Sequence, residues 1–262
     1  MNKFLAIAFL LCTVSVYSLC GKDQPRDYYQ IKIYHLKNKA QEAQLDEYLK
    51  NAYVPALHRA GIKQIGVFKL IEVDTTDQRV YVFIPYTKFE DIEALSDKLQ
   101  KDSQFNEAGK AYLQTAYNNP AYLRIESILL RAFPGMPEPA VPKLANAKSE
   151  RVYELRSYES ASEKYAASKL RQFNYGSEAG TELSIFPRLN FNPVFYGEVL
   201  FGSKMPNLMY MTTFLNKADR DEHWKAFNAD SEWQKLRAIP EYQNTVSKNN
   251  IVFLYPAEYS DF

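Results

Sequence analysis

Residues 29–34 read YQIKIY and residues 153–158 read YELRSY, so one strand-like pattern occurs twice in the chain. Two later stretches correspond in the same order. Residues 80–86 (VYVFIPY) match 208–214 (LMYMTTF), and residues 99–105 (LQKDSQF) match 227–233 (FNADSEW). Self-similarity over so long a period indicates a duplicated domain rather than a short stacked module. We therefore expect two copies of one structural unit.

Each half reads in the order β-α-β-β-α-β, which is typical of the ferredoxin-like unit and places the chain in the α+β class. Alternating and helical spacings of apolar residues carry this reading. In the first half we expect strands at 28–36, 64–73, 79–86 and 122–132, and helices at 39–60 and 89–100. In the second half we expect strands near 151–159, 193–202, 207–214 and 245–255. Pro55 is expected to break or kink the first helix.

A proline-rich segment separates the two copies. Residues 134–150 read PGMPEPAVPKLANAKSE, and four prolines with few large apolar residues predict an extended linker. The expected domains are therefore residues 27–133 and residues 151–262, joined by this linker. Asp102-Ser103 and Asp230-Ser231 recur at matched positions, and each pair is expected to cap a short following helix.

The N-terminus is typical of a secretory signal peptide. Residues 1–18 combine a positive charge, a short apolar run and a small residue at the exit. The run is shorter than the roughly 20 residues that a membrane span requires. We expect export to the periplasm or the extracellular space, with cleavage near Ser18. Lipid attachment at Cys20 remains the alternative, although Leu19 is larger than the residue expected before a lipid-bearing cysteine.

The charge balance excludes two classes of partner. The formal net charge is +1 and falls to zero when Lys3 leaves with the signal peptide. Nucleic-acid-binding proteins normally carry a basic excess, so no nucleic-acid partner is expected. No second segment is long and apolar enough to span a membrane, and no membrane span is expected in the mature protein.

Four stretches resemble the NIPSNAP family, and its secreted bacterial branch in particular. They are VYELRSY at 152–158, NPVFYGEVLFG at 192–202, DEHWKAFNADSEWQKLR at 221–237 and LYPAEYSDF at 254–262. The resemblance implies a dimeric α/β-barrel in which two ferredoxin-like sheets meet face to face with the helices outside. In tandem members one chain supplies both sheets. The family has no agreed catalytic motif, while relatives of the fold include cofactor-free monooxygenases and haem proteins.

The two faces of the matched strand differ in polarity. Tyr153, Leu155 and Ser157 share one face, which we expect to pack on the helices, while Glu154, Arg156 and Tyr158 share the other. The polar face should then point toward the opposite sheet or a cavity. The expected ligand-binding residues are Glu154, Arg156, Tyr158, Tyr196, Tyr210, His223 and Trp224. The simpler alternative is that Glu154 and Arg156 only neutralise each other.

The three histidines do not predict a metal site. His35, His58 and His223 lie in different elements and lack the spacing of zinc ligands. His223 precedes Trp224 on a helix and is a candidate base or axial haem ligand. Its counterpart in the first half is Leu95, which favours a packing role. We therefore predict no cofactor and keep haem as a minor alternative.

Two classes of function remain open. The first is a small-molecule binding or interaction module without turnover, acting on an unidentified ligand or protein partner, with homo-oligomer formation left open. The second is a cofactor-independent monooxygenase-like enzyme acting on a cyclic or aromatic substrate. In either case we expect the second half to carry the site, because Glu154 and Arg156 stand where the first half has Gln30 and Lys32. An arginine can bind a carboxylate or phosphate in two directions, which lysine cannot do.

Overall fold

The computed structural model describes residues 24–72, 77–175 and 180–262. The predicted signal peptide at residues 1–18 and Cys20 lie outside the described residues. Where the chain is described, no helix is long and apolar enough to cross a membrane.

The first half follows the predicted order of strands and helices. Its elements are β1 (Tyr28–Leu36), α1 (Lys39–Tyr48), a π-helical turn (Leu49–Tyr53), α2 (Val54–Arg59), β2 (Gly66–Leu70), β3 (Gln78–Tyr86), α3 (Glu90–Lys101), α4 (Ser103–Ala108), α5 (Lys110–Leu113) and β4 (Arg124–Ala132). The predicted helix at 39–60 changes its hydrogen-bond pattern before Pro55, which lies in the first turn of α2. A proline is tolerated there because the amide it lacks would have no partner within the helix.

The second half repeats this order. Its elements are β5 (Val152–Glu159), α6 (Glu163–Leu170), a second π-helical turn (Arg171–Tyr175), α7 (Glu182–Arg188), β6 (Asn192–Phe201), β7 (Asn207–Phe214), α8 (Lys217–Ala229), α9 (Ser231–Arg237) and β8 (Lys248–Pro256). Both predicted caps are confirmed. Asp102 accepts a hydrogen bond from the Phe105 amide at the start of α4, and Asp230 accepts one from the Trp233 amide at the start of α9.

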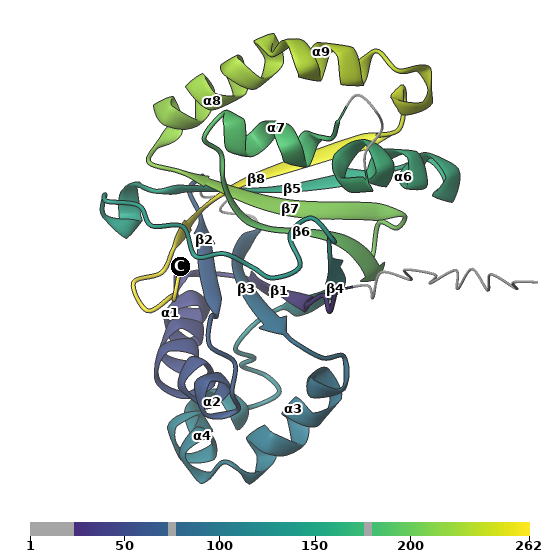
Figure 1. The fold of residues 1–262 in the computed structure, drawn as a ribbon. Coiled ribbons are helices and arrows are strands. Elements are labelled where there is room, and N and C mark those ends of the chain that lie inside the picture. Colours follow the sequence, from purple (N-terminus) through teal and green to yellow (C-terminus); the bar gives the residue numbers. More distant parts are fainter. Residues whose placement is uncertain (1–23, 73–76, 176–179) are drawn as a thin grey trace, which may run out of the picture.

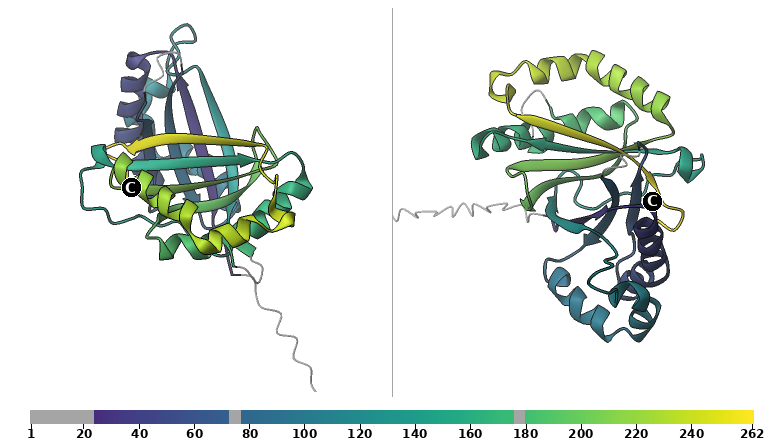
Figure 2. Two further views of the ribbon diagram at one scale, coloured as in Figure 1. Left: turned by 90° about the horizontal axis from the view of Figure 1, so that it is seen from above. Right: turned by 180° about the vertical axis from the view of Figure 1, so that it is seen from behind.

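The eight strands close into one antiparallel barrel in the order β1-β3-β2-β8-β5-β7-β6-β4. Each half contributes four neighbouring strands, and the two sets meet at two hydrogen-bonded seams. β2 pairs with β8 at one seam, and β4 pairs with β6 at the other. The helices of the two halves cover opposite outer sides of the barrel (Figures 1 and 2). The expectation of a barrel with external helices is therefore confirmed.

Three apolar cores fill this architecture. The barrel interior holds side chains from both halves, including Tyr29, Phe83, Tyr153 and Phe195. A second core lies between the first-half strands and α1 to α4, and a third lies between the second-half strands and α6 to α9. Because the interior core draws on both halves, neither half can bury its share of that core alone.

The predicted orientation of the strand faces is wrong. The apolar faces, with Tyr29 and Ile31 on β1 and Tyr153 and Leu155 on β5, point into the barrel rather than toward the helices. Tyr158, from the polar face of β5, lies in the core beneath the helices. The barrel interior is lined mainly by aromatic and aliphatic side chains, so the more hydrophobic face buries more favourably there. The expected polar cavity between the two sheets therefore does not form.

Candidate functional site

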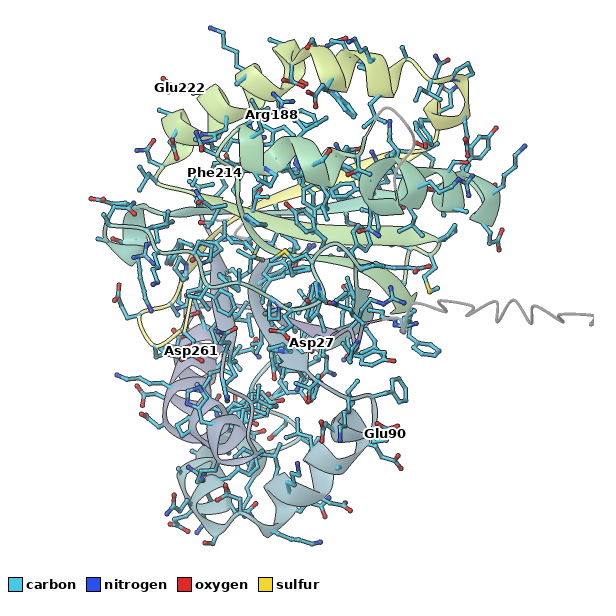
Figure 3. The ribbon with its side chains drawn as sticks, viewed as in Figure 1. Asp27, Glu90, Arg188, Phe214, Glu222 and Asp261 are labelled. Carbon is cyan, nitrogen blue, oxygen red and sulfur yellow. The ribbon has the colours of Figure 1, made fainter. Side chains whose placement is uncertain are left out.

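Several of the predicted site residues meet beneath α8, on the outer face of β5 and β7, in the layer of side chains between this helix and the sheet (Figure 3). Glu154 is their centre, and its side chain is 0% exposed. Its carboxylate accepts hydrogen bonds from Arg156 Nε at 2.7 Å, Arg220 Nε at 2.9 Å and Trp224 Nε1 at 2.8 Å. Glu154 and Arg156 thus form a buried ion pair, and Arg220 completes it from α8.

The electrostatics of this cluster follow from its contacts. Burial alone would raise the pKa of Glu154, but the Arg220 hydrogen bond and the charges of Arg156 and Arg220 lower it below its usual value. Sequence reasoning missed Arg220. Arg220 lies four residues before Trp224 on a helix, so both side chains lie on the same helical face. This spacing could have indicated from the sequence that Arg220 joins the cluster.

Arg156 links the carboxylate to a pair of tyrosines. Its guanidinium stacks on the Trp224 ring at 3.7 Å from the centroid, and its Nη1 donates to the Tyr158 hydroxyl at 2.9 Å. The Tyr158 and Tyr210 hydroxyls are 2.9 Å apart. Burial raises the pKa of Tyr210 well above its ordinary value, and the neighbouring Tyr158 adds to the effect. The Tyr210 hydroxyl therefore stays neutral, and these hydrogen bonds join the cluster into one network.

The remaining predicted residues do not join this network. Tyr196 is buried among aromatic rings, with Phe173 and Tyr210 at centroid distances of 5.4 and 5.8 Å. His223 packs against Phe191 and Phe214, and its Nδ1 lies 2.7 Å from the Asp219 carbonyl oxygen. These contacts are typical of packing positions. In the described residues, no group of three or more His, Cys, Asp or Glu side chains could hold a metal ion.

A cavity of about 220 Å³ opens beside Tyr158, between α6 and the neighbouring ends of β5, β6 and β7. Its wall is mostly aliphatic, with Ala166, Ala167, Leu170, Val199, Met205 and Leu208. Of the seven predicted site residues, Tyr158 alone lines it. His223 does not, so the residues present do not fit a haem held by that histidine in this cavity.

Asn207 borders this cavity at the start of β7, but its side chain lies on the face of the strand that points into the barrel, with Met209 and Met211. It is 7% exposed and donates a hydrogen bond from Nδ2 to Ser157 Oγ at 2.9 Å. Its Oδ1 is buried and has no hydrogen-bond partner among the described residues, which is uncommon. The sequence marked residue 207 only as the beginning of a strand, so it gave no signal for this burial.

The charged residues at the cavity have one sign. Glu163, in the first turn of α6, and Glu198, on β6, line the cavity together with Tyr158 and Asn207, whereas no lysine or arginine of the described part of the chain lines it. Next to the Tyr158 ring, α6 also buries Lys169, whose Nζ lies 5.2 Å from the ring centroid. Lys169 forms an ion pair with the buried Glu182 of α7, so its charge is compensated away from the cavity.

Comparison with known proteins finds a family model that matches the second half and solved structures that resemble the whole chain in fold. The NIPSNAP family model matches residues 153–261. A NIPSNAP family protein from Agrobacterium tumefaciens shares 18% identity, covering 47% of this chain and 98% of its own, with a TM-score of 0.36. No curated protein matches the sequence.

Two solved structures resemble nearly the whole chain. A candidate monooxygenase from Lactobacillus acidophilus has a TM-score of 0.55 at 10% identity, covering 88% of this chain and 94% of its own. A candidate monooxygenase from Fusobacterium nucleatum has a TM-score of 0.52 at 8% identity, covering 89% and 93%. At such low identity the likeness shows the fold alone.

Proposed function

We propose that this chain, whose second half (residues 153–261) belongs to the NIPSNAP family, is a small-molecule binding protein. Its binding site is the cavity beside Tyr158 and Asn207. One observation carries this proposal: a cavity of about 220 Å³ with a mostly aliphatic wall lies beside Tyr158, and two carboxylates, Glu163 and Glu198, line it. Such a cavity is complementary to a small apolar molecule that carries a positive charge.

The size and lining of the cavity define the ligand class. An apolar cavity of about 150 Å³ holds one benzene molecule, so a cavity of about 220 Å³ accommodates one ring with a short substituent. The aliphatic wall favours an apolar body. Glu163 and Glu198 favour an amine, because a cation would be attracted to both carboxylates.

The network beneath α8 has a positioning role in this proposal. Tyr158 belongs to both the cavity wall and the network, and its hydroxyl is held by Arg156 and Tyr210. Arg156 is in turn fixed by Glu154 and Trp224. A wall residue fixed in this way keeps the cavity open without rearrangement, which lowers the entropic cost of binding.

The proposal includes the origin and location of the chain. We take residues 27–133 and 151–262 as copies of one ferredoxin-like unit, because both follow the same order of elements, and residues 134–150 as their linker. We take the protein to be exported on the strength of its signal-like N-terminus. Cleavage near Ser18 and lipid attachment at Cys20 are distinguished by N-terminal sequencing and mass measurement of the mature protein.

A cofactor-independent oxygenase is the second candidate function. The likeness in fold to two candidate monooxygenases favours it, as does a cavity that accommodates a single ring. The two functions are separated by oxygen consumption. A ligand that binds without consuming oxygen supports the binding protein, and a ligand that is oxidised in the purified protein supports the enzyme.

The test is a thermal-shift titration with matched single-ring probes. Benzylamine should raise the melting temperature more than benzyl alcohol or toluene, because only its ammonium group is attracted to Glu163 and Glu198. Glu198→Gln should reduce this preference, and Arg156→Lys should weaken binding by releasing Tyr158. Lys32→Arg, in the first half, is the control and should bind like the unchanged protein. Equal shifts for benzylamine and toluene, or an unchanged benzylamine shift in Glu198→Gln, would overturn the proposal.

A further inference from the structure

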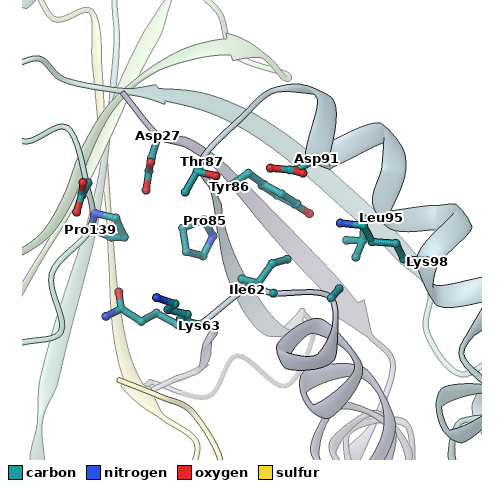
Figure 4. Close-up of a pocket in the computed structure, with 14 residues that line it drawn as sticks. Asp27, Ile62, Lys63, Pro85, Tyr86, Thr87, Asp91, Leu95, Lys98 and Pro139 are labelled. Atoms are coloured by element: carbon teal, nitrogen blue, oxygen red, sulfur yellow. The ribbon is translucent and has the colours of Figure 1, made fainter. Parts of the chain in front are cut away.

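A larger cavity, of about 340 Å³, lies in the first half, far from the predicted site in the sequence. Five chain segments build it: the residue before β1, the loop between α2 and β2, the end of β3, the outer side of α3, and the linker (Figure 4). Sequence reasoning assigned no role to this region. Its volume falls within the range of about 300–1,000 Å³ that is usual for small-molecule sites.

The cavity holds charges of both signs that do not neutralise one another. Asp27 and Glu138 line it on the side of the linker, and Lys63 comes from the loop after α2. Figure 4 shows Asp27 and Lys63 on opposite sides of Pro85. Among the described residues, none of the three takes part in an ion pair. Opposite charges held apart across a cavity are complementary to a ligand that carries both charges.

The backbone fixes both sides of this arrangement. The Asp27 amide donates to the Pro137 carbonyl at 2.9 Å, and the Asp27 carbonyl accepts from the Ala132 amide at 2.8 Å. These bonds hold the linker beside the first strand, so Glu138 stands next to Asp27. On the other side Gly61 adopts a φ of +100°, which favours glycine, and turns the chain after α2 toward Lys63.

The surroundings of Asp27 favour the binding of a cationic group beside it. Burial, and secondarily the charge of Glu138, raise the pKa of Asp27 to about 6. No basic group offsets these two effects, although Lys63 and Lys98 line the same cavity. An ammonium group placed between Asp27 and Glu138 would reverse the shift. The apolar part of the lining, with Ile62, Pro85 and Leu95, would receive an aliphatic side chain.

We propose that this cavity is a second binding site, specific for an apolar α-amino acid in its zwitterionic form. The ammonium lies between Asp27 and Glu138, the carboxylate faces Lys63, and the side chain packs on Ile62 and Leu95. This site is separate from the cavity beside Asn207, and neither proposal depends on the other.

Isothermal titration of the intact protein with leucine and two derivatives tests the assignment. Leucine should bind, whereas N-acetylleucine, which lacks the ammonium, and leucinamide, which lacks the carboxylate, should each bind at least about tenfold more weakly, a loss of about 1.4 kcal/mol. Binding of leucine should also weaken below about pH 6 as Asp27 takes up a proton. The other charged groups facing Asp27 in the cavity are Glu138, Asp91, Lys63 and Lys98.

Single substitutions test whether leucine binds in this cavity. Asp27→Asn and Lys63→Gln should each weaken leucine binding about tenfold or more, while Lys110→Gln, at an exposed position on α5, should not change it. Asn207→Ala should also leave leucine binding unchanged, which separates this site from the first. Absence of heat with leucine, binding of either derivative as tight as that of leucine, or unchanged leucine binding by Asp27→Asn would overturn the proposal. A thermal melt of each variant confirms that it is folded.

Discussion

At the scale of single residues, Glu154 is the most constrained charge in the molecule's second half. It is fully buried and receives hydrogen bonds from Arg156, Arg220 and Trp224. Removing one partner of a buried ion pair is costly because it leaves the opposite charge buried and uncompensated. A substitution of Glu154 should therefore destabilise the packing of the helices around Tyr158.

We predict that Glu154→Gln lowers the free energy of unfolding by about 3 kcal/mol or more, because Arg156 and Arg220 lose their counter-charge. Urea denaturation measures the effect. Glu241→Gln is the control, since Glu241 pairs with Arg171 at the surface, where such pairs contribute at most about 1 kcal/mol. Equal losses for the two variants would contradict the prediction.

The same residue predicts a response to acid. The folded-state pKa of Glu154 is lowered, so its stabilising contribution is complete above the unfolded pKa of about 4.3 and is lost as the pH falls through the lower folded value. The unfolding free energy of the unchanged protein should decline below about pH 4, and the stability difference between it and Glu154→Gln should narrow there. A constant difference down to pH 3 would argue against the assignment.

Asp27 predicts a pH dependence of the opposite sign. Its pKa is raised to about 6 in the folded protein, compared with about 3.9 in an unfolded chain. Between these values the folded state binds more protons, so this residue makes the protein less stable as the pH rises. Asp27→Asn should therefore raise the melting temperature at pH 7 and change it little near pH 4. Thermal melts of both proteins at pH 7 and pH 4 test this prediction. A lower melting temperature of Asp27→Asn at pH 7 would contradict it.

At the scale of elements, the junction between α8 and α9 depends on one capping side chain. Asp230 accepts hydrogen bonds from the amides of Glu232 and Trp233 and is held by Arg188. Asp102 repeats this arrangement at the start of α4, with Phe105 and Arg59 as partners. The duplicated cap explains why the Asp-Ser pair recurs in the two halves.

Asp230→Ala should lower the free energy of unfolding by about 1 kcal/mol, because the start of α9 loses its N-cap. Asp230→Asn is the matched variant. It retains the capping oxygen and removes only the surface attraction to Arg188, so it should lose less than Asp230→Ala. Urea denaturation of both variants checks the order. A larger loss for the asparagine variant would show that the ion pair, rather than the cap, stabilises this junction.

At the scale of the whole molecule, the shared barrel interior couples the two halves. Phe83 of β3 stacks on Phe195 of β6 with centroids 4.8 Å apart, although these strands belong to different halves. Both seams of the barrel also join the halves through backbone hydrogen bonds. We therefore expect a single cooperative unfolding transition rather than two.

Phe83→Ala tests this coupling, because both tryptophans, Trp224 and Trp233, lie in the second half. The variant should lose about 3–5 kcal/mol, and its unfolding midpoint should shift equally by tryptophan fluorescence and by far-ultraviolet circular dichroism. Phe89→Ala, at a position 46% exposed, is the control and should change little. If the tryptophan midpoint did not move, the halves would unfold independently.

The sequence alone determined the order of strands and helices, the duplicated pattern and the two capping aspartates. These features depend on neighbours a few residues apart, so local spacing was sufficient to predict them. It also named seven expected ligand-binding residues. The structure brings five of them, Glu154, Arg156, Tyr158, Tyr210 and Trp224, into one buried network, and Tyr158 alone of the seven lines the neighbouring cavity. His223 and Tyr196 were included from their aromatic surroundings, and they pack outside that network.

Only the tertiary structure decided which way the strand faces point and where the cavities lie. Both faces of β5 are buried, so the alternation of its side chains distinguishes one face from the other without showing which one enters the barrel. The cavity beside Tyr158 could not be found from the sequence, because the residues of α6, β6 and β7 that line it meet only in the folded chain. The cavity of the first half was hidden for the same reason. Asp27, Lys63 and Glu138 are distant in sequence and meet only when the linker pairs with the start of β1.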